Sequence, residues 1–95
     1  MTADTIHRVN AVICNERGLH ARASAKFVTL AAKFEADIQV TKEDVTVAGI
    51  SIMGLLTLGA GPGTEIELTA RGPEAEAALA ALVELITRGF GEELA

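Results

Sequence analysis

The sequence predicts an α+β open-faced sandwich, in which a four-stranded antiparallel sheet carries three helices on one face. Two observations favour this class. Three segments place apolar residues at helical spacing and four have strand patterns, in the order β-α-β-β-α-β-α. At least two of the strand segments alternate apolar and polar residues, which predicts a sheet with one face exposed to water.

The predicted strands are short. Their segments are residues 9–13, 36–41, 45–48 and 64–70. In the second and fourth segments every other residue is apolar, as expected where one side of a strand is buried. Residues 45–48 are expected to pair with residues 36–41 across residues 42–44, which predicts a hairpin.

The predicted helices follow three apolar patterns. The first stripe consists of Leu19, Ala23, Phe27, Leu30 and Phe34, and the last consists of Ala75, Leu79, Leu82 and Ile86. Pro73 suits the first position of the last helix, and Arg88-Gly89 suits its end. Between them, Ser51 is a good cap for a short helix through Leu58, which the glycine-rich residues 59–63 terminate.

Length and composition indicate one domain over residues 1–95. The chain has 95 residues, of which 49% are hydrophobic, enough for one modest core. Cys14 is the single cysteine, so an intramolecular disulfide is impossible. No apolar run reaches 18 residues, which argues against a membrane span or a secretory signal. We therefore expect a cytoplasmic, monomeric protein that does not enter the membrane.

The charge distribution predicts a small anion site. A formal net charge of −5 argues against nucleic-acid binding, which requires a basic surface. Residues 17–33 nevertheless contain no acid, and their bases are Arg17, Arg22, Lys26 and Lys33. Two interpretations remain open, namely a solvated helix face and a site for an anion or an acidic partner.

His20 is the candidate reactive residue, because it falls at or just before the start of the first predicted helix. Histidine is not a favoured helix cap, so stability does not account for it. Free amide groups and the helix dipole attract an oxyanion there, and Arg22 and Arg17 can bind phosphate oxygens. Gly18 allows a tight turn and a close approach of the backbone. Because neutral imidazole is a nucleophile, the pattern predicts a histidine that holds a phosphoryl group.

The other candidate ligands have simpler interpretations. A solvated loop histidine remains the alternative for His20 itself. His7 is expected on a strand surface, and Cys14 is expected to be a small buried hydrophobic residue. These three residues lack a recognised metal-binding spacing, so the sequence predicts no metal and no cofactor.

Two motifs resemble those of a known family. Gly18-Leu-His-Ala-Arg22, followed by Ser24-Ala-Lys-Phe-Val28, resembles the histidine-phosphorylation motif of HPr, the phosphocarrier of the bacterial phosphoenolpyruvate-dependent phosphotransferase system. The segment from Gly49 to Gly59 resembles the second signature of that family, around a regulatory serine. The resemblance extends from about residue 5 to residue 88, which implies a core at about residues 5–88 and a C-terminal tail at residues 89–95.

The resemblance implies a role for each matching position. His20 would receive a phosphoryl group from phosphorylated enzyme I and pass it to a histidine of an EIIA-type domain, and Arg22 would steady that group. Ser51 would be modified by an HPr kinase/phosphorylase. The implied partner-docking residues are Ile52, Met53 and Leu56. The protein would be a carrier, not an enzyme that turns over a substrate by itself.

Alternatives remain at this level. Ala23 replaces the usual proline of the family, and Ile50 stands where many members have lysine. The C-terminal residues resemble the nitrogen-related branch of the same system, in which the phosphate relay serves regulation. A small acylphosphatase-like hydrolase has a similar length and a similar anion-binding loop. An interaction module that docks through its apolar patch without carrying phosphate is the third alternative.

Overall fold

The computed structural model describes residues 5–95. Its elements follow the predicted order, with one short 3₁₀ helix added at the C-terminal end. They are β1 (His7–Val12), α1 (Ala21–Ala31), β2 (Asp37–Lys42), β3 (Val45–Ala48), α2 (Ile52–Thr57), β4 (Glu65–Arg71), α3 (Ala75–Thr87) and η1 (Gly89–Gly91).

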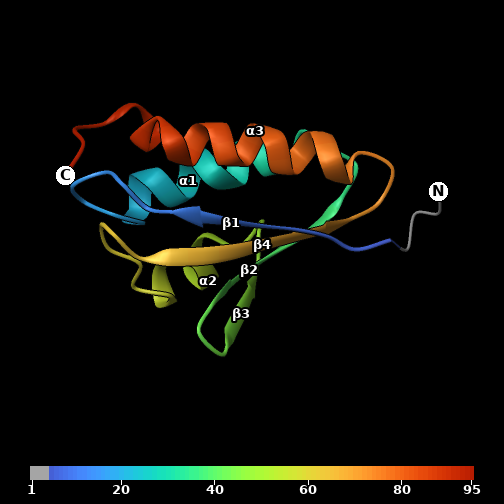
Figure 1. Cartoon of the computed structure of the whole chain (residues 1–95), viewed down its shortest axis with the longest axis horizontal. Helices are drawn as coiled ribbons and strands as arrows, with labels where there is room; N and C mark the ends of the chain where they lie inside the picture. Colours follow the sequence, from blue (N-terminus) through green and yellow to red (C-terminus); the bar gives the residue numbers. More distant parts are fainter. Residues whose placement is uncertain (1–4) are drawn as a thin grey trace.

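The four strands form one antiparallel sheet in the order β1-β4-β2-β3 (Figure 1). The register places a continuous row of apolar residues across all four strands, because Val9 lies opposite Leu68, Leu68 opposite Val40 and Val40 opposite Val47. Directly opposed residues point to the same face of a sheet. One face is therefore apolar from edge to edge, as the alternation in the sequence predicts.

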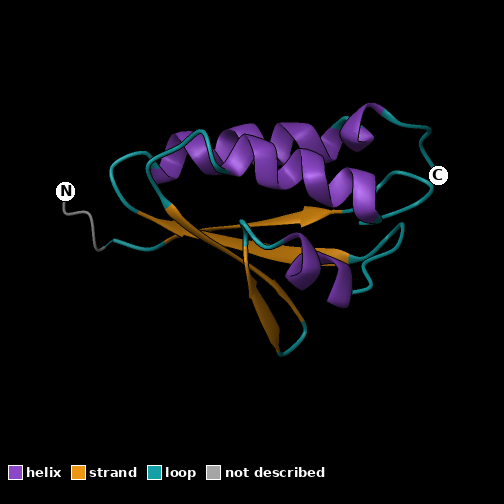
Figure 2. Cartoon of the chain, turned by 180° about the vertical axis from the view of Figure 1, so that it is seen from behind, coloured by secondary structure: helices purple, strands orange, loops and turns teal. Residues whose placement is uncertain are grey.

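The three helices cover this apolar face, so the predicted open-faced sandwich is confirmed. The long helices α1 and α3 lie side by side across it, and the short helix α2 lies near β2 and β3 (Figures 1 and 2). Phe27 of α1, Leu82 of α3 and Leu55 of α2 are each fully buried in one hydrophobic core. Burial of a side chain of this size stabilises the fold by roughly 1.5–3 kcal/mol.

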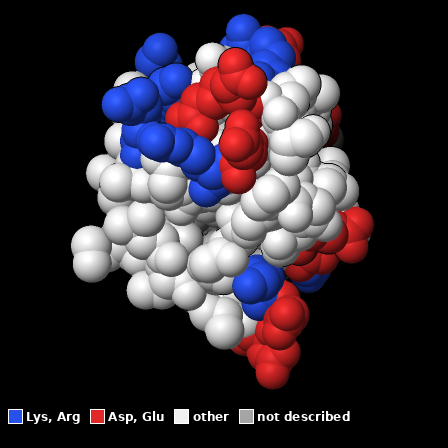
Figure 3. Space-filling model, turned by 90° about the vertical axis from the view of Figure 1, so that its left-hand side faces the viewer, with Lys and Arg blue, Asp and Glu red and all other residues white. Residues whose placement is uncertain are grey.

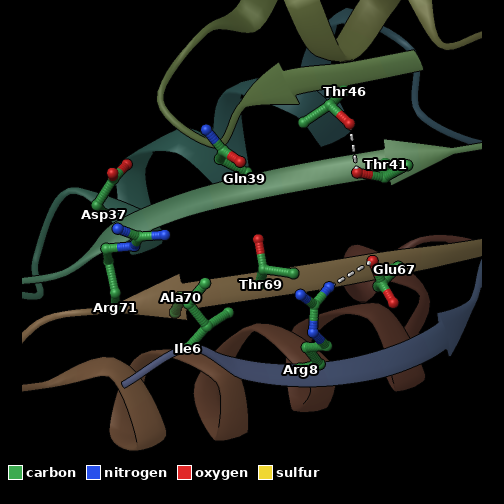
Figure 4. A pocket seen from close by; sticks show the side chains of 10 residues that line it. All are labelled: Ile6, Arg8, Asp37, Gln39, Thr41, Thr46, Glu67, Thr69, Ala70 and Arg71. Carbon is green, nitrogen blue, oxygen red and sulfur yellow. Dashed lines mark hydrogen bonds and ion pairs between the residues drawn. The ribbon is translucent and has the colours of Figure 1, made fainter. Parts of the chain in front are cut away.

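The opposite face of the sheet is open and polar (Figure 4). Its side chains form local pairs, such as Arg8 with Glu67 at 3.5 Å and Thr41 with Thr46 at 2.7 Å. A surface hollow of about 470 Å³ lies on this face. It contains none of the residues that the sequence predicts for the site, so the predicted chemistry lies elsewhere.

The strand boundaries lie within two residues of the predicted ones, and three other differences concern the helices and the C-terminal limit of the core. Helix α1 ends at Ala31, so Phe34 lies beyond it and packs against the core from the turn that leads into β2. Helix α3 begins at Ala75 with Glu74 as its N-cap, which places Pro73 outside the helix. Phe90 is only 1% exposed and belongs to the core, two residues past the limit expected from the sequence.

Within residues 5–95, none of the helices has both the length and the apolar character that a membrane crossing requires.

Candidate functional site

The loop between β1 and α1 is fixed by a close backbone approach at Gly18. Gly18 has φ +65°, and a Cβ atom there would collide with the carbonyl oxygen of Ala60 and lie 2.9 Å from the Cα atom of Gly61. The next amide, of Leu19, donates a hydrogen bond to the same Ala60 oxygen at 2.9 Å. Only glycine fits this conformation and spacing without strain. The contact therefore fixes the residue that follows, His20, at the start of α1.

His20 is the N-cap of α1, where the sequence pattern places it. Its Nδ1 atom accepts a hydrogen bond from the Arg22 amide at 3.3 Å. The imidazole nitrogen thus takes the place of the hydroxyl or carboxylate oxygen that usually caps a helix. Within the described residues, the amides of Ala21 and Ala23 have no acceptor. Two donors and the positive end of the helix dipole thus remain available beside Nδ1.

The other ring nitrogen of His20 faces a carboxylate that the sequence analysis did not predict. Nε2 lies 2.9 Å and 2.8 Å from the two carboxylate oxygens of Glu92. Because Nδ1 accepts a hydrogen bond, the neutral ring carries its proton on Nε2 and donates it to Glu92. The hydrogen bond from His20 lowers the pKa of Glu92, and a further bond from Asn15 and the charge of Lys26 act in the same direction, against the opposing effect of burial.

Glu92 reaches His20 because the C-terminal residues pair with the loop that precedes α1. Leu94 forms an antiparallel bridge with Asn15, and the Ala95 amide donates to the Cys14 carbonyl oxygen at 2.9 Å. Figure 1 shows the C-terminus beside this loop. Sequence reasoning treated residues 89–95 as a tail outside the core, although an apolar Phe90 between two glycines was a signal that this segment packs.

Basic side chains surround the same end of the molecule. Arg17, Arg22 and Lys26 line a surface cavity of about 360 Å³ together with Glu92. Figure 3 shows basic and acidic side chains gathered in the upper part of this end, above a broad region without charged side chains. Within residues 5–95, neither Arg17 nor Arg22 forms an ion pair with a carboxylate. Both guanidinium groups are therefore free to bind an anion.

Ser51 and its neighbours form a second group of predicted residues. Ser51 is the N-cap of α2, and its Oγ accepts a hydrogen bond from the Gly54 amide at 2.9 Å. Ile52 and Met53 are 39% and 70% exposed, whereas Leu56 is half-buried. Ile50, at 65% exposed, was not predicted for this group. We define Ile50, Ile52 and Met53 as the α2 patch.

The remaining candidates lie away from His20 or lack partners for chemistry. His7 is half-buried on β1, not on its open surface as expected, and its Nδ1 lies 3.8 Å from Glu76. Cys14 is half-buried, whereas the sequence predicts a small buried hydrophobic residue, and its thiol donates to the carbonyl oxygen of Ile86 at 3.2 Å. The described residues contain no cluster of three or more His, Cys, Asp or Glu side chains suited to a metal ion.

Comparison with known proteins agrees with this geometry. Residues 8–88 match the family described as "PTS HPr component phosphorylation site". The phosphocarrier protein HPr of Neisseria meningitidis serogroup A is 50% identical over 80 residues, which cover 84% of this chain and 90% of that protein. The phosphocarrier protein NPr of Shewanella violacea is 41% identical over 80 residues, which cover 84% of this chain and 88% of that protein.

A solved structure gives the same result in three dimensions. The HPr of Thermoanaerobacter tengcongensis superposes with a TM-score of 0.88 at 45% identity, covering 93% of this chain and 99% of that one. The fold and these matches thus define a phosphocarrier of the phosphotransferase system (PTS). This chain belongs to the HPr family.

Proposed function

We propose that His20 accepts a phosphoryl group on Nδ1 from phosphorylated enzyme I and passes it to a histidine of an EIIA-type protein. The observation that carries this proposal is the position of Nδ1, which caps α1 beside the unbonded amides of Ala21 and Ala23. With its proton on Nε2, the neutral ring has its nucleophilic lone pair on Nδ1. Attack at that atom brings about two negative charges to the amino end of a helix.

The surroundings favour a phosphoryl group that is held but still transferable. The helix dipole contributes on the order of 0.3–1 kcal/mol to a charge at this position. A charge-assisted hydrogen bond from Arg22 adds about 1.5–3 kcal/mol in a favourable geometry. Arg17, on the loop before α1, lines the same surface cavity as Arg22 and is the third member of the proposed site. Interactions of this size do not trap the group irreversibly, which suits a carrier.

The test compares the two histidines of the chain. The wild-type chain, His20→Ala and His7→Ala are incubated with enzyme I and labelled phosphoenolpyruvate, and an EIIA-type acceptor is then added. We expect the wild type and His7→Ala to take up label and pass it on, and His20→Ala to take up none while remaining folded by circular dichroism. Label on a folded His20→Ala chain would disprove the assignment.

We also propose that phosphorylation of Ser51 by an HPr kinase/phosphorylase regulates docking through the α2 patch and the half-buried Leu56. The position of Ser51 supports this, because a phosphoryl group there is compatible with a helix start but places charge beside exposed apolar side chains. Such a change weakens docking without unfolding the domain. The kinase should label the wild type and not Ser51→Ala; equal labelling of both would exclude this site.

The family contains both HPr and NPr relatives of this chain, so the regulatory, nitrogen-related branch remains the second candidate. Transfer rates to a sugar-specific EIIA domain and to its nitrogen-related counterpart distinguish the two. The same assay tests the hydrolase alternative. Rapid release of inorganic phosphate from the labelled chain without any acceptor would favour a hydrolase over a carrier.

A further inference from the structure

The C-terminal segment is a built part of the His20 site. Gly89, Phe90 and Gly91 all have positive φ, at +61°, +57° and +74°, and they reverse the chain directly after α3. The left-handed conformation costs a residue with a Cβ about 1–2 kcal/mol. Phe90 offsets this cost because its ring is only 1% exposed, and burial of such a ring contributes roughly 1.5–3 kcal/mol. The segment that carries Glu92 is therefore anchored in the core.

Donors approach the Glu92 carboxylate from two directions. Asn15 is fully buried, and its Nδ2 donates to Glu92 at 3.0 Å and to the Gly18 carbonyl oxygen at 2.9 Å. The His20 ring donates from the other direction, and the side chains of His20 and Glu92 are 23% and 15% exposed. The same amide thus holds both the carboxylate and the loop that places His20. The other charged residues that face this cavity are Glu16, Arg17, Arg22, Lys26 and Glu93.

We infer that Glu92 is a positioning residue, whose carboxylate holds the His20 ring and balances the positive charge that the ring gains when Nδ1 takes a phosphoryl group. The inference rests on the proposed phosphorylation of His20. In that step the Nδ1 lone pair gives up its hydrogen bond from the Arg22 amide and forms the new bond to phosphorus, and the electron pair of the broken bond stays on the donor. The ring keeps its Nε2 proton and becomes cationic, and that proton points at Glu92. A carboxylate behind a histidine stabilises an imidazolium in this way in other active sites.

The main test uses Glu92→Gln, which keeps a group of the same shape and removes the charge. Glu93→Gln is the matched control, because it removes the same charge from the neighbouring exposed residue, whose side chain makes no hydrogen bond to His20. With enzyme I and phosphoenolpyruvate, we expect Glu92→Gln to lower kcat for phosphoryl acceptance about tenfold, the lower end for a charged hydrogen bond. The KM for the chain should stay unchanged, and Glu93→Gln should have a smaller effect on kcat.

A spectroscopic measurement reports on the contact without any phosphoryl transfer. In the unphosphorylated wild type, the Nε2 proton of His20 should give a resolved NMR signal, because its bond to Glu92 slows exchange with water. Glu93→Gln should retain this signal, and Glu92→Ala should lose it. Retention of the signal in Glu92→Ala would overturn the inferred contact.

The outcomes separate this inference from the proposed function. A wild-type chain that takes up no label refutes the proposed function. A wild-type chain that takes up label, with Glu92→Gln no slower than Glu93→Gln, refutes only the role of Glu92. A raised KM with unchanged kcat in Glu92→Gln would assign Glu92 to docking and would also overturn the inference.

Discussion

Within residues 5–95, two histidine–glutamate pairs have rings of similar exposure but different surroundings. The side chains of His7 and His20 are almost equally exposed, at 22% and 23%. His20 lies 2.8 Å from Glu92, which is 15% exposed, whereas His7 lies 3.8 Å from Glu76, which is 68% exposed. An ion pair with an exposed partner contributes little, and a shielded hydrogen-bonded pair contributes more. Exposure alone would therefore not distinguish the two rings.

The backbone around the two pairs explains the difference. His7 belongs to β1, and its glutamate projects from the first turn of α3. His20 caps α1, so one ring nitrogen meets the helix start and the other meets a carboxylate held by Asn15. A ring that is hydrogen-bonded at both nitrogens has a defined tautomer and a defined orientation. The comparison indicates that hydrogen bonds at both ring nitrogens, and not accessibility, distinguish His20 from His7.

The largest effect is expected from Phe90→Ala, which removes the buried ring that anchors the segment carrying Glu92. Loss of a buried phenyl ring should lower the free energy of unfolding by about 3–5 kcal/mol, measured by urea denaturation. The signal of the His20 Nε2 proton should disappear, whereas the His7 ring signals should not shift. Leu94→Ala, which truncates an exposed side chain on the same segment, is the control and should change stability by less than about 0.5 kcal/mol. Retention of the Nε2 signal in Phe90→Ala would show that the anchor does not position Glu92.

A smaller effect is expected from Arg22→Ala. This variant compares the arginine beside His20 with Arg8, the arginine next to His7. Arg22 is exposed and forms no ion pair within the described chain, so its loss should change stability little. Phosphoryl acceptance should slow about tenfold, because one charge-assisted hydrogen bond to the phosphoryl group is removed. Arg8→Ala, next to His7, is the control and should leave the rate unchanged. Equal rates in the two variants would exclude Arg22 from the site.

The fold was predictable because its signals are local. Strict alternation around Val40 and Leu68 and the apolar stripe of α3 each lie within one element, where side-chain period reports burial directly. The end of α1 was not predictable in the same way. Phe34 continues the apolar spacing of the helix, but the helix ends at Ala31 and Phe34 packs against the core from the turn that follows. An apolar stripe shows which residues are buried, and it does not show which conformation buries them.

The candidate site also has one part that the sequence predicts and one part that it does not. The placement of His20 at a helix start follows from the neighbouring sequence, and Gly18 indicates the turn before it. The contact with Glu92 joins residues 72 positions apart, and no periodicity links them. Charge also misleads here, because Glu92 and Glu93 are adjacent and identical in the sequence while only Glu92 meets the ring. Such a contact becomes visible only when the fold brings the two segments together.

The smallest expected effect concerns pH and compares Glu92→Gln with Glu76→Gln. The fold lowers the pKa of Glu92, so its carboxylate stabilises the native state fully above its unfolded pKa of about 4.3, and this stabilisation is lost as pH falls through the lowered native value. The wild type should therefore exceed Glu92→Gln in free energy of unfolding by about 1 kcal/mol at pH 5, and by progressively less toward pH 3. Urea denaturation of the wild type and of Glu92→Gln at each pH gives this difference. The carboxylates that both chains share titrate alike, so their contributions to the free energy of unfolding cancel. Glu76→Gln should show a smaller difference from the wild type at pH 5, because Glu76 is exposed and 3.8 Å from its histidine. A difference for Glu92→Gln that grows on acidification would contradict the assigned hydrogen bond, since it would require a carboxylate stabilised in its protonated form.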